Sequence, residues 1–229
     1  MKNSIFPIIV PKAMLIAGLC SIAVMLPAQA GTDLQMSQYL FPDFTACVVK
    51  LKNGVGDNMV VNYNTITEMM AIKKDDIIYG MASINLVDTI IINDRHFVPV
   101  GKVFYEVIVN APVSAFIQHK SKLLPPGKPV GYGGTSKTAS VDSYSYVPEK
   151  GGVYKVEILD DSEIKPSPLY WVRKDDSMIS FLNKRQFVKI FPEKSTEIEA
   201  FINQNNIKIE NRDDLIRLVN YCNKIIQHK

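Results

Sequence analysis

Histidine is the residue type of this chain best suited to acid–base chemistry, and His119 is the histidine with the most useful neighbours. A serine hydrolase brings together a nucleophile, a base that takes its proton and an acid that orients the base. His119 could act as the base, with Asp142 as the acid and Ser143 or Ser136 as the nucleophile. The chain lacks the Gly-x-Ser-x-Gly elbow that presents such a serine, which weakens this interpretation.

A structural role for His119 is the favoured alternative. His119 falls on a predicted strand, on the same face as Val113, Ala115 and Ile117. Apolar residues at alternate positions mark the buried face of a strand, so we expect a buried, hydrogen-bonded histidine here. His96 follows a predicted turn and is expected to face solvent.

Glycine, serine and tyrosine dominate the segment 125–152, which is predicted to be one long loop. Its run Gly131 to Lys137 resembles a phosphate-binding loop but lacks the GxxxxGK[ST] spacing. Tyr132, Tyr144 and Tyr146 offer flat apolar rings with polar tips, which suit recognition of a protein or a glycan. The alternative is that these rings fold inward and cover the sheet.

No pattern in the sequence predicts a metal or another cofactor. The paired aspartates fall mostly at predicted turns, and the Asp-x-Asp-x-Asp spacing of a calcium loop is absent. Neither a CxxC motif nor a cluster of cysteine and histidine occurs. Cys47 and Cys222 both lie at positions expected to be buried, and they form either two inert thiols or one disulfide between the first strand and the last helix.

Apolar residues recur with a period near two over most of the chain from residue 45 to residue 182, as in half-buried antiparallel strands. The predicted strands are 45–52, 59–64, 69–73, 76–79, 87–92, 96–100, 103–109, 113–123, 153–159, 169–173 and 178–182. Trp171 alternates with Tyr170 and is expected to be a core or strand-pairing residue.

The period changes after residue 182, where spacings of three and four predict helices around Phe187, around Ile198 and from 215 to 226. Asn211 and Asp214 resemble a capping box before the last helix. The predicted fold is α+β, with an antiparallel sheet over residues 31–182, curved into a partial barrel or packed as two layers. Three helices over residues 183–229 are expected to pack on it.

The first 30 residues are predicted to be a cleavable signal peptide. Lys2 and Lys12 precede an uncharged apolar stretch, and Ala28-Gln29-Ala30 provides small residues at the cleavage site, so the mature chain is expected to begin at Gly31. The stretch is short for a membrane-spanning helix, which needs roughly 20 residues, although a retained anchor is an alternative. We expect a periplasmic or secreted protein without a transmembrane segment after cleavage.

Electrostatics give no reason to expect a nucleic-acid partner. The formal net charge of the full chain is +3, and loss of Lys2 and Lys12 lowers it by two, to about +1. The expected partner is instead an envelope protein or a glycan.

Three stretches of the chain carry a resemblance to a known family. VVKLKNG with VVNYNTITEMMAI, then VGYGGTSKTASVDSYS, and then FLNKRQFVKIFPEKSTEIEAFINQNNIKI with DDLIRLVNYCN resemble a family of uncharacterised exported proteins of Gram-negative bacteria. The resemblance implies an envelope or secreted location and a β body with a helical end. It implies no catalytic residue.

Three functions from different classes follow as hypotheses. The first is a non-catalytic binding or scaffolding protein of the cell envelope, with residues 131–146 as its contact region. The second is a periplasmic hydrolase that uses His119 with a serine or aspartate of that segment. The third is a structural or assembly protein.

Overall fold

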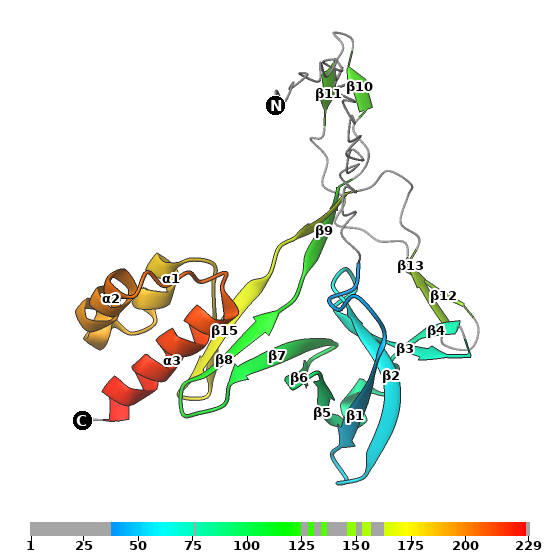
Figure 1. Ribbon diagram of the computed structural model, residues 1–229, viewed down its shortest axis with the longest axis horizontal. Coiled ribbons are helices and arrows are strands. Elements are labelled where there is room, and N and C mark those ends of the chain that lie inside the picture. The colour runs from blue at the N-terminus through cyan, green and yellow to red at the C-terminus, as the bar shows by residue number, and fades with distance from the viewer. Residues whose placement is uncertain are drawn as a thin grey trace, which may run out of the picture. The chain divides into compact units, whose positions relative to one another are not determined.

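The computed structural model describes residues 38–75, 77–124 and 163–227, together with the backbone of four short strands between residues 128 and 156. All of these residues lie within one compact unit that spans residues 35–229. Most of the described chain is antiparallel sheet, and helices follow it at the C-terminal end (Figure 1). The predicted α+β fold is therefore confirmed.

Twelve strands form the large sheet in the order β12-β13-β4-β3-β2-β1-β5-β6-β7-β8-β15-β16. Every pairing within it is antiparallel. The two end strands, β12 and β16, do not pair with each other, so the sheet stays open. The strand bounds are β1 Thr45–Leu51, β2 Gly56–Asn64, β3 Met69–Lys74, β4 Ile77–Gly80, β5 Val87–Ile92, β6 Arg95–Val100, β7 Val103–Val109, β8 Ser114–Gln118, β12 Tyr146–Glu149, β13 Val153–Val156, β15 Leu169–Lys174 and β16 Ser177–Phe181.

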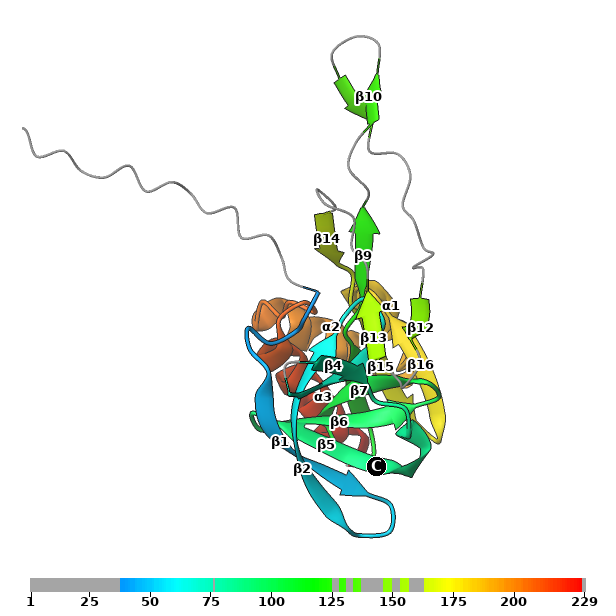
Figure 2. The same ribbon diagram turned by 90° about the vertical axis from the view of Figure 1, so that its right-hand side faces the viewer.

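Two small ribbons accompany the large sheet. One pairs β9 (Ser121–Leu124) with β14 (Glu163–Pro166), and the other pairs β10 (Lys128–Val130) with β11 (Gly134–Ser136). Figure 2 shows β9 continuing from the body of the molecule beside β14.

Short turns with left-handed backbone connect several strands. Asn93 and Asp94 both have positive φ, 47° and 63°, between β5 and β6. Asp175 and Asp176 do the same between β15 and β16, with φ of 49° and 60°. Asparagine and aspartate tolerate this conformation better than other residues with side chains, so these predicted turns have a local cause.

Three α-helices follow the last strand: α1 Lys184–Lys189, α2 Ser195–Gln204 and α3 Arg212–Gln227, with the 3₁₀ helix η2 Pro192–Lys194 leading into α2. The 3₁₀ helix η1 (Ile84–Leu86) precedes β5. Asn211 caps α3, because its Oδ1 accepts a hydrogen bond from the amide of Asp214 at 3.0 Å. Asp214 does not return this bond as in a full capping box; its Oδ2 accepts from the amide of Lys208 at 3.0 Å.

Two clusters of buried apolar side chains form the core. The first cluster lies among β1, β2, β3, β5, β6 and the start of β7, and it includes Tyr63, Phe97 and Phe104. The second lies between the helices and β7, β8, β15 and β16, and it includes Phe187 and Leu218. The helices therefore pack on one end of the sheet, as predicted, and β7 contributes to both clusters.

The cysteines belong to different clusters. Cys47 is a free, buried thiol in the first cluster, and Cys222 is a free, buried thiol in the second. Of the two alternatives, the structure therefore shows two separate thiols and no disulfide between Cys47 and Cys222. Burial raises the pKa of Cys47 to about 11 and that of Cys222 to about 12, so neither is a ready nucleophile at neutral pH.

Some of the predicted elements differ from the structure. The single strand predicted over 113–123 is two strands, because the chain leaves the large sheet after Gln118 and pairs with β14 from Ser121. Within 125–152, predicted as one loop, lie β10, β11 and β12, and β14 was not predicted.

Candidate functional site

The most concentrated group of ionised side chains surrounds Glu106 of β7, whose side chain is fully buried. Its Oε1 accepts hydrogen bonds from the Nε atoms of Arg95 and Arg212, both at 2.9 Å. Its Oε2 contacts Nη2 of Arg95 and lies 2.7 Å from Nε2 of His119. We call these four residues the Glu106 cluster. They come from β6, β7, the end of β8 and the first turn of α3.

Local structure explains how His119 reaches Glu106. Strand β8 ends at Gln118, so His119 is outside the regular ladder. Its ring packs edge-on against Tyr63, with centroids 5.9 Å apart, and lies 6.4 Å from the ring of Phe97. The histidine is therefore largely buried, with 14% of its side chain exposed, and hydrogen-bonded, which is the structural role that the sequence favours.

Burial and the neighbouring charges set the protonation of this cluster. Burial alone would raise the pKa of Glu106, but the hydrogen bonds from His119 and Arg95 and the charge of Arg95 lower it to about 2. For His119, burial lowers the pKa, and the opposing effect of Glu106 does not outweigh it. Glu106 is therefore ionised and His119 neutral at neutral pH.

The Glu106 cluster is poorly suited to catalysis. A carboxylate whose pKa is about 2 takes up a proton only in strong acid, so Glu106 is a weak base at neutral pH. Nε2 of His119 is already in contact with Glu106 and with Nη2 of Arg95, at 2.7 and 3.0 Å. The cluster instead connects the start of α3 to three strands of the sheet.

Most of the sequence-predicted site residues lie outside the described residues. Tyr132, Tyr144, Asp142, Ser143, Ala30 and Gly31 are among them. Tyr146 begins β12 and Ser136 ends β11, where only the backbone is described. The triad with His119 and the tyrosine contact region therefore stay predictions.

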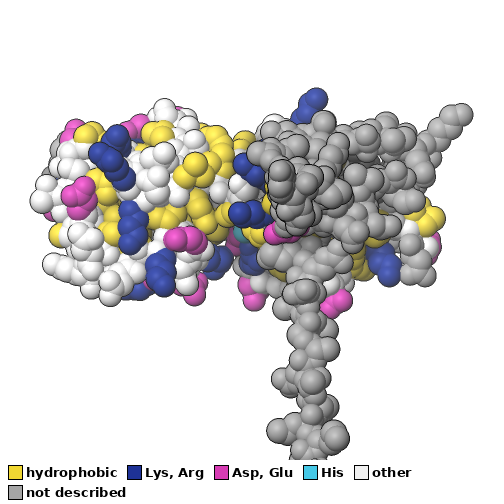
Figure 3. All heavy atoms as spheres, turned by 90° about the horizontal axis from the view of Figure 1, so that it is seen from above, with side chains coloured by type: hydrophobic (Ala, Val, Ile, Leu, Met, Phe, Trp, Pro, Cys, Tyr) yellow, Lys and Arg dark blue, Asp and Glu magenta, His cyan; other side chains and the backbone are white. Residues whose placement is uncertain are grey.

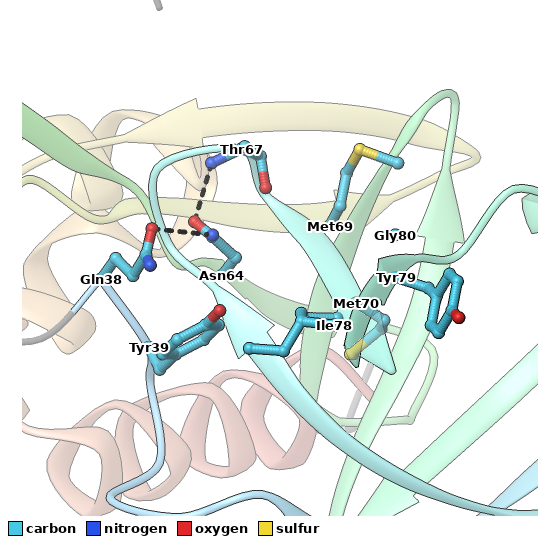
Figure 4. A pocket seen from close by; sticks show the side chains of 10 residues that line it. Gln38, Tyr39, Asn64, Thr67, Met69, Met70, Ile78, Tyr79 and Gly80 are labelled. Atoms are coloured by element: carbon cyan, nitrogen blue, oxygen red, sulfur yellow. Dashed lines mark hydrogen bonds between the residues drawn. The ribbon is translucent and has the colours of Figure 1, made fainter. Parts of the chain in front are cut away.

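A small cavity near the start of the described chain is too confined for an organic ligand. Figure 4 shows Asn64 at its edge, donating to Oε1 of Gln38 at 3.2 Å and accepting from the amide of Thr67 at 3.1 Å. The cavity measures about 30 Å³, which suits a water molecule. Two larger hollows, of about 170 Å³ beside His119 and about 280 Å³ between η2 and the end of α3, are still below the roughly 300 Å³ of typical ligand sites.

A groove of about 730 Å³ crosses the large sheet and is lined mostly by side chains of the face opposite the core clusters, with Val87 and Ile108 of those clusters also reaching it. The strand register defines this face, because Ile91, His96, Val107, Phe116 and Trp171 pair in sequence across β5, β6, β7, β8 and β15. The next residues along, such as Phe97 and Ile117, point into the core. The sequence-predicted exposure of His96 is confirmed, and this histidine lines the groove.

The groove has an aliphatic floor and a charged rim. Half-buried Val98, Val100 and Val107 line it together with Phe116. Charged groups of both signs also line it: Lys52, Asp88, Asp94, Arg173 and Arg212. Its volume lies within the roughly 300 to 1,000 Å³ of ligand sites.

Arg173 of β15 is the most firmly placed cation of the groove. Its Nη2 donates to Oγ of Ser114 at 3.1 Å, and its guanidinium lies 5.6 Å from the centre of the Phe116 ring. Ser114 in turn donates to the carbonyl oxygen of Ala111 at 2.7 Å. Within the described part of the chain, no carboxylate forms an ion pair with Arg173.

Neighbouring aromatic residues hold β15 in place beside the groove. Trp171 stacks on Tyr105 with ring centres 5.6 Å apart, and its Nε1 donates to Oε1 of Gln118 at 3.0 Å. Trp171 is therefore a strand-pairing residue, as the sequence indicates. The groove itself was not predicted, although the outward alternation of His96, Val98 and Val100 is a signal for it.

Basic side chains form no separate patch on the described part of the face that Figure 3 shows. Lysine and arginine side chains lie there among acidic and apolar ones. This mixture agrees with the small formal net charge of the chain.

The protein is thus an α+β protein with an open antiparallel sheet, helices at its C-terminal end and a ligand-sized groove across the sheet. Within the described residues, no group of three or more histidine, cysteine, aspartate or glutamate residues could hold a metal ion. No described helix combines the length and hydropathy needed to cross a bilayer. No protein-family model, curated protein or solved structure matches the chain.

Proposed function

We propose that this protein is an exported, non-catalytic binding protein that receives an extended polypeptide in the groove. One observation carries the proposal: a groove of about 730 Å³ with an aliphatic floor and charged rims crosses the large sheet from β5 to β15. Its volume and its mixture of apolar surface with a few polar groups are typical of binding sites.

The lining favours a polypeptide over a glycan. Sugars bind best to flat, exposed aromatic rings, whereas Phe116 is only 5% exposed and the other apolar residues of the lining are valine, isoleucine, proline and methionine. An aliphatic floor of this size suits the apolar side chains of a peptide laid across it. Charges of both signs on the rim suit a partner that also carries both signs.

A binding role also agrees with the state of the nucleophilic and basic groups. The two described cysteines are buried with raised pKa values, and His119 is engaged with Glu106. The described residues therefore present no activated nucleophile.

Export is part of the proposal and rests on the sequence. The basic and then apolar start of the chain and the small residues before Gly31 support a cleaved signal and a periplasmic or secreted location. Edman sequencing of the native product tests this: a first residue of Gly31 supports export, and a product that begins at Met1 in the cytosol contradicts it.

A peptide-display screen tests the binding function. The purified protein is exposed to a library of random short peptides, and the enriched peptides are measured by fluorescence anisotropy. Val98→Asp places a charge on the groove floor and is expected to weaken binding about tenfold or more. Val60→Asp is the matched control, because Val60 is an exposed valine of the same sheet outside the groove.

Two results would contradict the proposal. The first is a screen that enriches no peptide. The second is a set of enriched peptides that bind Val98→Asp and the unchanged protein equally well.

A further inference from the structure

We propose that the groove selects peptides with an acidic side chain, and that Arg173 is the residue that binds this carboxylate. This inference rests on the proposed function and adds the chemical class of the ligand. Its basis is an arginine that the structure orients toward the groove and that has no acidic partner among the described residues.

The guanidinium of Arg173 is held before any ligand arrives. Phe116 lies under it, and Ser114 accepts one of its N–H groups. Both supports are rigid, because Ser114 is fully buried and Phe116 is 5% exposed. A planar guanidinium fixed in this way loses little freedom on binding and can donate two parallel hydrogen bonds to a carboxylate.

The other cations of the groove are less suited to this task. Arg212 already uses its Nε on Glu106. Lys52 is exposed at the β1–β2 hairpin, and no hydrogen bond or ion pair of its side chain is found among the described residues. Arg173 therefore combines an unpaired charge with a fixed position.

The acidic groups of the groove do not neutralise Arg173. Asp88 accepts a hydrogen bond from the hydroxyl of Thr89 at 2.9 Å, and Asp94 lies in the turn between β5 and β6. Neither forms an ion pair with Arg173. A ligand carboxylate would therefore provide the charge that the protein lacks at this point.

The apolar residues beside Arg173 predict which residues flank the acidic side chain in the peptide. Phe116 lies under Arg173, and Val107 pairs with Phe116 on the next strand. Val98 lies on the strand beyond, so the residues on one side of the acid are expected to be aliphatic. A charged hydrogen bond at a partly desolvated site changes affinity by about tenfold to a hundredfold.

Two pools of short synthetic peptides test this inference. The pools share random Val, Leu, Ser and Thr positions and differ only at a central position, which is Glu in one pool and Gln in the other. The unchanged protein is expected to bind the Glu pool about tenfold more tightly or better. Arg173→Gln is expected to bind both pools equally, and Arg173→Lys to keep only part of the preference.

Arg185→Gln is the matched control, because Arg185 is an exposed arginine on α1 outside the groove. It is expected to keep the full preference for Glu. Circular dichroism confirms that each variant is folded, and Arg173→Lys serves as the second variant if Arg173→Gln does not fold.

The outcomes separate this inference from the proposed function. Equal binding of both pools by the unchanged protein, or an undiminished preference in Arg173→Gln, overturns the role of Arg173 and leaves the groove as a peptide site. Failure of both pools to bind, with no peptide enriched by the library screen, overturns the peptide-binding function itself.

Discussion

Arg95 and Arg173 are two arginines on aromatic rings with opposite surroundings. Arg95 lies 5.0 Å from the ring centre of Phe41 and pairs with the buried carboxylate of Glu106. Arg173 lies 5.6 Å from the ring centre of Phe116 and has no described carboxylate partner. The first arginine is part of a closed ionic cluster, and the second leaves its charge open to a groove.

Solvent access explains the difference. A buried carboxylate such as Glu106 is tolerated only when hydrogen bonds and opposite charges compensate for its lost hydration. Arg173 is exposed, so water can solvate its charge without a partner. The comparison teaches that the Glu106 cluster maintains the fold, whereas Arg173 is available for recognition.

Removing the centre of the closed cluster is expected to have the largest effect. Glu106→Ala leaves Arg95 and Arg212 near each other without their carboxylate, and breaking a buried ion pair costs about 3 to 5 kcal/mol. Urea denaturation followed by circular dichroism measures this loss. Glu199→Gln, on the exposed face of α2, is the control and is expected to change little. A loss below about 1 kcal/mol for Glu106→Ala would show that the cluster does not maintain the fold.

Acid is expected to open the same cluster. The pKa of Glu106 is lowered to about 2 in the folded state from an ordinary value of 4.5, so its contribution is complete above pH 4.5 and disappears as the pH falls toward 2. We expect a loss on the order of 2 kcal/mol over this range. Glu106→Gln should flatten this part of the pH profile of unfolding; an unchanged profile would contradict the assignment.

His119 adds a second acid-sensitive step at higher pH. Its pKa is lowered by burial, so the unfolded chain takes up the proton first as the pH falls below 6.5 and the folded state loses stability. His119→Gln should reduce the slope that begins below pH 6.5 and leave the Glu106 step. The unfolding free energy measured below pH 6.5 checks the expectation, and an undiminished slope in His119→Gln would refute it.

Loss of the open arginine is expected to have the smallest effect on stability. Arg173→Gln should change the free energy of unfolding by no more than about 0.5 kcal/mol, because exposed charges contribute little. Arg95→Gln, which removes the counterpart in the closed cluster, should cost several times more. If Arg173→Gln and Arg95→Gln lowered the free energy of unfolding by similar amounts, the two arginines would not differ in their contribution to the fold.

Much of the fold follows from local patterns. The period of two locates β1, β5 and β7 within a residue or so, because alternate apolar side chains must reach the core. After β16 the apolar residues recur every three or four positions, and this spacing locates the helices because the apolar face of each helix must also reach the core. The short β14 escaped prediction, since EIKP has one buried residue and no alternation to detect.

The site depends on register, which the sequence does not reveal. Glu106 meets Arg212 from 106 positions away only because α3 begins beside β7. A signal for Glu106 does exist: it shares the inward face of β7 with Phe104 and Ile108, where a charged residue requires a buried partner. His119 was expected to be hydrogen-bonded, but its partner could be identified only once the pairing of β7 with β8 was known.

Strand β7 supplies Phe104 to one core cluster and Ile108 and Val109 to the other. Neither core cluster can open fully without disturbing β7, because both clusters contain residues of this strand. Amide protons along β7 should therefore exchange with solvent only when the whole unit unfolds, whereas those of the end strand β16 can exchange through local opening.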